Sequence, residues 1–444
     1  MIRRNIQLGI TLIELMVAMA IGVVVMLVVY QLFAVSESTR RTSVAGSDAQ
    51  MSAAIAVSAL QDQIRNGGYG LVGITSTTSK PQSSRILGCF VRGFDARAGG
   101  GPISFTLAPV VILQGADNNA AGNGTDSDTI RIVYSDLDYP TVPVNLLSGM
   151  LNPTADLKVT NRYGVKPGHV AMLVSTPADV TPPVLAASPA AAQQIIPPQA
   201  PTYVPPGYVC GLGEVNGTPN IPGQLDVVQH GNGAYLDPET NANTMPRFNG
   251  AAGFGNGGWQ FASSASLFNF GKNPSVVTFS VQNNQLMMVN LLGSGTTTPA
   301  AQAMVDGVVS LQAQYGVAVD NVDNSTGIAP PDGMADPGVG VSTWTTDVTQ
   351  IPRWPNPYAA DPNLSNATKW GTVVAIRFAV LTRSGQMERK DSSNNCTATP
   401  ATSPELTWSG GTFDVSNITD WQCYRYKKFE AVVPLRNIIW MPTS

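Results

Sequence analysis

A long apolar segment next to the amino terminus constrains what this chain can become. Residues 10–35, ITLIELMVAMAIGVVVMLVVYQLFAV, are apolar almost throughout, with Glu14 and Gln31 as the interruptions. A helix of about 20 apolar residues spans a lipid bilayer. Because Arg3 and Arg4 precede the segment, the positive-inside rule predicts that the leader stays in the cytoplasm and that everything after residue 36 lies outside.

Glu14 separates this segment from simpler membrane signals. A secretory signal peptide has a shorter apolar core and a small-residue cleavage site, whereas this run continues into more helix. A plain anchor leaves Glu14 unexplained, because a carboxylate in hydrocarbon costs roughly 3 kcal/mol on insertion scales. Cleavage between Gly9 and Ile10 would create an α-amino group on Ile10. That amine and the Glu14 carboxylate of an adjacent subunit could neutralise one another and register the two subunits.

These residues carry a resemblance to a known class of signal. Gly9-Ile10-Thr11-Leu12-Ile13-Glu14, after a short basic leader, resembles the class III signal of type IV pilins and type II secretion pseudopilins. The resemblance implies that a prepilin peptidase cuts after Gly9 and methylates the new amino terminus on Ile10. The residue after the cut is most often Phe in that family and is Ile10 here.

The helix is predicted to continue beyond the membrane. No proline occurs between Ser36 and Arg65, and apolar residues recur there at spacings of three and four. The members of this stripe are Met51, Ile55, Val57, Leu60 and Ile64, with alanines between them. Asn66-Gly67-Gly68 supplies a stop, since glycine adopts the left-handed conformation that ends helices. A helix over 11–65 would be about 80 Å long, and its outer half needs a domain to cover the stripe.

The rest of the chain is predicted to be rich in strands. Alternating or β-branched runs predict strands at 128–134, 169–175, 276–281, 285–290, 372–381 and 429–434. A second helix is expected over 300–310, followed by a strand at 311–315. The fold class is therefore α+β, in which a long amino-terminal helix packs on an antiparallel sheet domain with long loop insertions.

This pattern divides the chain into a leader at 1–9, a transmembrane or filament-core helix at 10–35, its amphipathic continuation at 36–66 and a β-rich globular domain at 67–444. Two stretches of the globular domain are expected as insertions on the surface. Residues 177–206 are rich in Pro and Ala, and residues 231–275 are rich in Gly and Asn.

The four cysteines predict disulfides if the domain is exported. Cys89, Cys210, Cys396 and Cys423 contain no CxxC pair, which disfavours a zinc site. Of the three possible pairings we favour Cys396 with Cys423, because the stretch between them resembles a hairpin-like excursion. That choice leaves Cys89 with Cys210. Free buried thiols are the alternative.

The sequence contains little that indicates catalysis or a cofactor. It has no GxSxG, Walker or HExxH motif, and His169 and His230 are isolated. A net charge of −4 without a basic block gives no support for nucleic-acid binding. One oxygen-rich loop could hold calcium, although its spacing departs from an EF-hand and a solvated turn is favoured. Its residues are Asp320, Asp323, Asn324, Asp332 and Asp336.

Later motifs narrow the resemblance to the PilW family of minor type IV pilins. They are Arg65-Asn66-Gly67-Gly68-Tyr69, the run DGVVSLQAQYG at 306–316, the run RFAVLTRS at 377–384, and Val433-Pro434-Leu435-Arg436-Asn437. The resemblance implies a low-abundance structural subunit, not an enzyme, that primes or caps pilus assembly. The implied partners are the prepilin peptidase, other minor pilins, the major pilin and a tip adhesin. The protein would reside in the bacterial inner membrane before assembly and in the cell-surface pilus afterwards.

Three other functions compete with this one. A minor pseudopilin of a type II secretion system would use the same signal, although the related pseudopilins are shorter. An adhesin module would use residues 177–275 to contact a surface. An anchored periplasmic enzyme would need a catalytic constellation, and the sequence offers no candidate. The biological role, whether twitching motility, DNA uptake or adhesion, does not follow from these residues.

Overall fold

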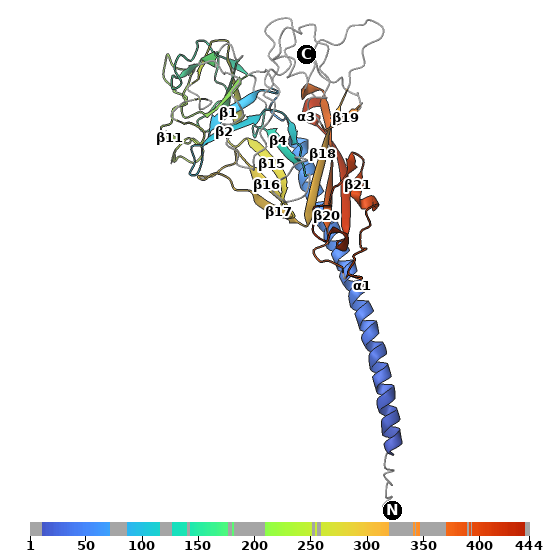
Figure 1. Cartoon of the computed structure of the whole chain (residues 1–444). Coiled ribbons are helices and arrows are strands. Elements are labelled where there is room, and N and C mark those ends of the chain that lie inside the picture. The colour runs from blue at the N-terminus through green and yellow to red at the C-terminus, as the bar shows by residue number, and fades with distance from the viewer. Residues whose placement is uncertain are drawn as a thin grey trace, which may run out of the picture.

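The computed structural model shows a long helix with a β-rich head at one end (Figure 1). It describes residues 11–71, 87–115, 127–139, 143–175, 180–181, 209–250, 254, 259–318, 341, 343–346, 370–388, 390–391 and 393–439. The α+β class predicted from the sequence is confirmed. The division of the chain at residues 9, 35 and 66 stays a prediction.

Helix α1 (Leu12–Asn66) confirms the predicted helix almost to the residue. Thr11 caps its amino end, because the Thr11 hydroxyl accepts a hydrogen bond from the Glu14 backbone and the Glu14 side chain accepts one from the Thr11 backbone. At the other end, Gly68 has a φ of +85°, which a residue with a side chain adopts only with strain. The Asn66-Gly67-Gly68 stop therefore works as expected.

The face of α1 that packs on the head is built from small residues. Ala49, Ala53 and Ala56 are buried, and the face continues through Leu60 and Ile64. The predicted stripe was partly wrong, since Met51 and Ile55 are exposed. Their positions lie on the opposite side of the helix, and the short alanine side chains let the sheet approach the helix axis closely.

The sheet that receives α1 has four antiparallel strands in the order β19-β18-β20-β23. They are β18 (Val308–Val317), β19 (Thr343–Thr345), β20 (Val373–Arg383) and β23 (Tyr426–Pro434). Ile376, Phe378 and Val380 of β20 face the helix and are fully buried. The predicted strands at 311–315, 372–381 and 429–434 correspond to β18, β20 and β23 and are confirmed.

A second antiparallel sheet lies beside the first, in the order β17-β16-β15-β4-β3. Its strands are β3 (Val110–Leu113), β4 (Thr129–Tyr134), β15 (Ser275–Gln282), β16 (Gln285–Asn290) and β17 (Gln302–Asp306). Three predicted strands correspond to β4, β15 and β16. The helix expected over 300–310 was wrong, because this stretch forms β17, a turn at Gly307 with a φ of +79°, and the start of β18.

A large part of the head is inserted between two neighbouring strands. Tyr134, the last residue of β4, pairs directly with Ser275, the first residue of β15. The chain therefore leaves and re-enters the five-stranded sheet at the same place, and we call residues 135–274 the inserted lobe.

The lobe supplies four strands of a six-stranded sheet with the order β2-β1-β9-β7-β14-β5. Strands β1 and β2 come from the chain before the lobe. The bounds are β1 (Phe90–Phe94), β2 (Pro102–Thr106), β5 (Val144–Asn145), β7 (Val170–Ser175), β9 (Val209–Glu214) and β14 (Ser266–Gly271). The strand predicted at 169–175 corresponds to β7.

Short two-stranded pairs complete the described strands. They are β6 (Leu157–Lys158) with β10 (Val227–Val228), β8 (Val180–Thr181) with β13 (Gln260–Phe261), β11 (Tyr235–Leu236) with β12 (Asn243–Thr244), and β21 (Thr407–Trp408) with β22 (Gly411–Thr412). Two 3₁₀ turns, η5 (Pro404–Leu406) and η6 (Trp421–Cys423), and the short helix α3 (Arg436–Ile439) follow β20 and β23.

Residues 231–275 were expected as a surface decoration, and the structure corrects this. Phe248, Phe261 and Phe270 from this stretch are buried, and β14 lies inside the six-stranded sheet. The Gly- and Asn-rich composition concealed aromatic anchors that fill the core of the lobe. The other expected insertion, 177–206, lies outside the described residues except for β8 at 180–181.

Side chains of the head form several polar contacts with α1, among them the Tyr134 hydroxyl, which donates to the Gln63 side chain at 2.8 Å. The hydroxyl of Thr382 in β20 donates to the carbonyl of Ala49 at 2.9 Å. The side-chain amide of Asn437 donates to the carbonyls of Arg65, Asn66 and Gly67 at 3.2–3.3 Å. Helices end with carbonyls that lack an intrahelical partner, and Asn437 supplies donors for them from the other end of the chain.

We predict that Asn437→Ala lowers the free energy of unfolding of the head by roughly 1–2 kcal/mol, since the helix end loses its donors. Asn437→Asp should be worse, because a carboxylate would face three carbonyls at the negative end of the helix dipole. Urea denaturation of both variants tests this. An Asp variant more stable than the Ala variant would contradict the capping role.

Candidate functional site

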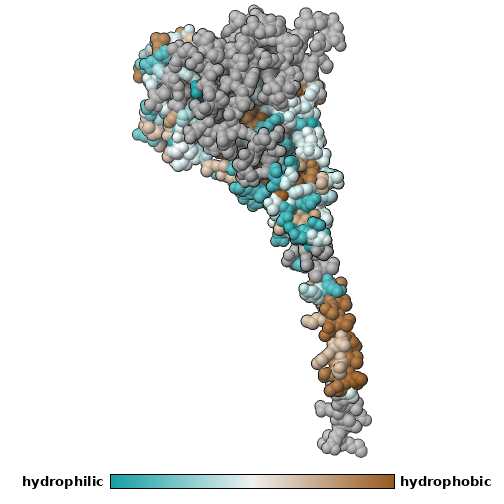
Figure 2. All heavy atoms as spheres, viewed as in Figure 1, coloured by the Kyte–Doolittle hydropathy of each residue, from teal (hydrophilic) through white to brown (hydrophobic). Residues whose placement is uncertain are grey.

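The part of α1 from Leu12 to Phe33 is apolar and none of it is buried, and Figure 2 shows it as a hydrophobic stretch of the helix below the head. Its large side chains between Leu12 and Phe33 are 43% to 78% exposed. The segment Leu12–Phe33 is long and apolar enough to cross a membrane. A core helix of a soluble protein passes the same test of composition, but its side chains would be covered by the protein. This surface therefore needs lipid or other helices.

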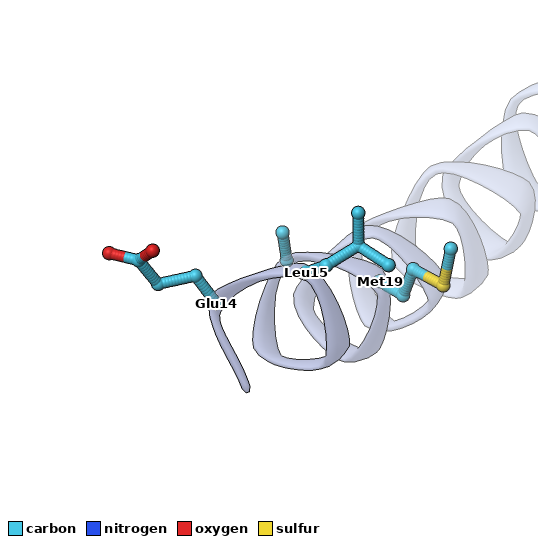
Figure 3. A pocket seen from close by; sticks show the side chains of 4 residues that line it. Glu14, Leu15 and Met19 are labelled. Atoms are coloured by element: carbon cyan, nitrogen blue, oxygen red, sulfur yellow. The ribbon is translucent and has the colours of Figure 1, made fainter. Parts of the chain in front are cut away.

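Glu14 lies in the first turn of this apolar surface. Figure 3 shows its carboxylate pointing away from the helix, with Leu15 and Met19 along the next turns. Glu14, Leu15, Ala18 and Met19 line a shallow depression on the helix surface. One Glu14 oxygen, Oε2, accepts hydrogen bonds from the backbone nitrogen and the hydroxyl of Thr11, both at 3.0 Å. The carboxylate is held at the helix start and stays open to a partner outside the chain.

A second exposed apolar stripe continues the surface along the upper half of α1. Val44, Met51 and Ile55 are 52%, 67% and 48% exposed. Their spacings of seven and four place them within about 40° of one another around the helix, opposite the alanine face that contacts the head. Heptad-like spacing of this kind is typical of a surface that packs against another helix.

Comparison with protein families matches both ends of the chain. Residues 4–30 match the family model described as Prokaryotic N-terminal methylation motif. Residues 275–437 match the model described as Type IV Pilus-assembly protein W. This chain is a type IV pilus-related minor pilin. Comparisons with curated proteins and with solved structures give no match.

The predicted site residues and the later sequence motifs of the minor pilin fall inside the two matches. Gly9, Ile10 and Glu14 fall inside the methylation-motif match, and the later motifs at 306–316, 377–384 and 433–437 fall inside the second match. Gly9 and Ile10 lie outside the described residues, so their roles in cleavage and methylation stay predictions. The second match begins at Ser275, where the chain returns from the inserted lobe.

The later motifs of the minor pilin meet at α1. The run at 377–384 contains Thr382, which binds the Ala49 carbonyl, and the closing motif contains Asn437, which binds the helix end. Sequence reasoning identified the motifs but missed these contacts. An apolar run gives no signal for a single buried hydroxyl, and the partners lie hundreds of residues apart.

Both disulfides are present in the minor pilin. Cys89 bonds to Cys210, and Cys396 bonds to Cys423. These are the two pairs that the sequence analysis favoured. The loop considered for calcium, with Asp320, Asp323, Asn324, Asp332 and Asp336, lies outside the described residues. Within the described part of the chain, no group of three or more His, Cys, Asp or Glu side chains is placed to hold a metal ion.

The two histidines of the minor pilin are buried in the inserted lobe. His230 Nε2 lies 2.7 Å from the carbonyl of Ala155, and the ring contacts Phe254 edge to face. Its Nδ1 is buried without a hydrogen-bond partner among the described residues. Burial lowers the pKa of His230 and of His169. Both therefore stabilise the fold as neutral rings.

We predict that the lobe loses stability on mild acidification. A His pKa below 6.5 in the folded state means that the unfolded chain binds more protons, so stability is full above pH 6.5 and falls as the pH drops. His230→Gln keeps a donor for Ala155 and should reduce the slope of unfolding free energy against pH, by at most about 1.4 kcal/mol per pH unit. Denaturant titrations at pH 5 to 8 measure it.

Glu214 acts in the opposite sense, since burial raises its pKa against the opposing effect of Arg247. The folding stability that Glu214 contributes is lost as the pH rises through the pKa of Glu214 in the folded state. Because Glu214 is present in both proteins, it cancels in the comparison of the wild type with His230→Gln. Equal slopes in the two proteins would refute the assignment to His230.

Proposed function

We propose that this minor pilin primes or caps a type IV pilus as a structural subunit rather than an enzyme, after prepilin peptidase removes residues 1–9. The observation that carries the proposal is the surface of α1. Its first half is unburied and apolar with Glu14 at the start, while its second half is fixed to the head by packing and by Thr382 and Asn437. Any force or position imposed on the helix is passed to the head.

Glu14 supports a role in registering one subunit on another. A carboxylate in the hydrocarbon layer is unfavourable without a partner, and Thr11 satisfies only one of its two oxygens among the described contacts. Cleavage after Gly9 would place a positive amine on Ile10 of each subunit. The amine of one subunit and the Glu14 carboxylate of the next would then neutralise each other where both are shielded from water.

The orientation proposed from Arg3 and Arg4 places the leader in the cytoplasm and the head outside. Before assembly the subunit would lie in the inner membrane, where the peptidase reaches Gly9. Afterwards it would join other minor pilins and the major pilin in the filament. The Val44, Met51 and Ile55 stripe supports this step, because it offers a neighbouring helix an apolar seat above the membrane-spanning part.

The shape of the head supports a position at the end of the filament. The inserted lobe extends to one side of the helix axis (Figure 1). A subunit within a filament shaft has neighbours around and above it, so a bulky lateral lobe is accommodated with the least steric conflict at the tip. A priming complex that starts the filament would end up there.

A second candidate function, adhesion by the lobe, has its own support. Most of the exposed large apolar side chains in the described part of the head lie in the lobe, and exposed apolar groups of this kind often mark contact surfaces. In the lobe they are Tyr139, Leu147, Leu151, Tyr163, Ile221, Leu225, Leu236 and Met245, against Met304, Met387 and Val432 elsewhere.

The first experiment is mass spectrometry of the amino terminus in cells with and without prepilin peptidase. A start at N-methylated Ile10 that requires the enzyme is expected. Gly9→Val should block the cut, because a larger side chain is excluded at the scissile bond. An intact Met1 start in wild-type cells, or a mature-size band in Gly9→Val, would overturn the assignment.

Glu14→Ala should be cleaved normally and yet be incorporated poorly into pili, because the amine of the neighbouring subunit would have no counter-charge. Glu14→Asp keeps the charge and should recover part of the incorporation. Immunoblots of sheared pili against whole cells separate cleavage from incorporation. Wild-type incorporation of Glu14→Ala would rule out the pairing.

Met51→Lys and Ile55→Lys should also reduce incorporation while leaving cleavage and folding unchanged, since each puts a charge on the exposed stripe. Gln50→Lys is the matched control, because residue 50 is exposed but lies on a different side of α1. If Gln50→Lys reduces incorporation as strongly as the stripe variants, the effect comes from charge alone and the stripe is not a helix seat.

A further inference from the structure

The inserted lobe is joined to the pilin scaffold by two peptide connections that leave from one point. Residue 135 follows the last residue of β4, and residue 274 precedes the first residue of β15, and these two strand ends are paired as Tyr134 with Ser275. Because both strand ends leave the sheet together, a pull on the lobe loads them in the same direction at one edge of the sheet. The neck is therefore a single pivot, about which the lobe can rotate unless it is held at a second place.

Few hydrogen bonds reinforce this neck. The Ser135 hydroxyl donates to the Phe270 carbonyl at 2.9 Å, and the Asn273 backbone donates to the Asp136 carboxylate at 2.7 Å. Tyr69, just after α1, accepts from the Ser135 backbone at 2.8 Å and donates its hydroxyl to the Asp138 carbonyl at 2.8 Å. These contacts set the orientation of the lobe relative to the helix, but they too lie at a single place.

A covalent bond joins the lobe to the scaffold at a second place. Cys89 immediately precedes β1, outside the lobe, and Cys210 lies in β9, inside it. Both cysteines are fully buried. Besides the bond, β1 and β9 are joined by a parallel pairing of three residues, Phe90 with Val209 through Arg92 with Gly211. Apolar packing of Val91 with Leu212 and a backbone hydrogen bond from Ala96 to the Arg247 carbonyl add non-covalent contacts there.

The β1–β2 hairpin is itself pinned to the five-stranded sheet. Arg97, just after β1, forms a buried two-pronged ion pair with Asp95. The same guanidinium donates to the carbonyls of Leu291 and Gly293, just beyond β16, at 2.8 and 2.6 Å. A bidentate arginine whose ion pair is buried is a geometrically specific anchor. A force on the lobe that is transmitted through the disulfide to Cys89 therefore reaches the five-stranded sheet through Arg97, at a different place from the β4–β15 neck.

We infer that the Cys89–Cys210 disulfide is a tether that carries tension and keeps the inserted lobe in contact with the pilin scaffold, with the Asp95–Arg97 hairpin as its anchor. The inference rests on the proposed function in one respect, namely that a subunit at a filament end carries tension through its head. Cys396–Cys423 differs, because it closes a loop of 27 residues outside the lobe.

Single-molecule pulling on the full chain in detergent micelles tests the tether. One handle is attached at Ser36 on α1 and the other at Leu225 in the lobe, through bio-orthogonal side chains that add no thiol. The wild type should resist until the scaffold itself unfolds. Cys89→Ser/Cys210→Ser should show a first event at clearly lower force. Its total extension should exceed the wild type by the 121 residues between the cysteines, or roughly 400 Å.

Cys396→Ser/Cys423→Ser is the matched control and should keep the wild-type force for the first event. Asp95→Leu/Arg97→Met removes the anchor while the tether remains, and it should also lower the first force. This second variant keeps the inference testable if the first fails to fold. An unchanged first force in either variant would overturn the tether. The pulling assay needs no filament. It can therefore refute the tether while the incorporation experiments support the proposed function, or support the tether while those experiments refute the proposed function.

Discussion

Close packing between the alanine face of α1 and the sheet of β20 and β23 is the contact on which the rest of the molecule depends. Ala49, Ala53 and Ala56 are almost fully buried, and their small side chains bring β20 near enough for the Thr382 hydroxyl to reach the Ala49 carbonyl. Because one face of the helix is committed to the head in this way, Val44, Met51 and Ile55 are left outside. The same packing thus creates both the rigid joint and the exposed stripe.

Local patterns predicted the elements whose sequence and environment agree. The helix α1 followed from its apolar periodicity and its glycine stop, and β4 followed from alternation, with its predicted bounds of 128–134 within one residue of the observed ones. The stretch at 300–310 failed because its alanines favour helix locally, whereas pairing of β17 with β16 and of β18 with β20 decides the outcome. Strand partners far along the chain leave no trace in an eleven-residue window.

The residues of the candidate site also divide into those whose role a local sequence pattern predicts and those whose role it does not. Glu14 could be identified from sequence because its cost in lipid is a property of one residue in its own segment. Asn437 could not, since its role comes from meeting helix carbonyls some 370 residues earlier in the chain. The limits of the inserted lobe were equally hidden. They depend on the pairing of Tyr134 with Ser275, and no local pattern marks two strand ends so far apart in the chain as neighbours.

That pairing also explains how a pilin scaffold can carry so large an addition. The strands β4 and β15 keep an uninterrupted antiparallel register from Phe279–Ile130 to Ser275–Tyr134, so the sheet is formed as it would be with a tight turn in place of the lobe. The family match over 275–437 begins at the first residue of β15 and covers β20 and β23, which hold α1. The inserted lobe lies outside that match. The helix, its joint and its exposed stripe are therefore built from residues outside the lobe, which the neck and the Cys89–Cys210 disulfide connect to the scaffold.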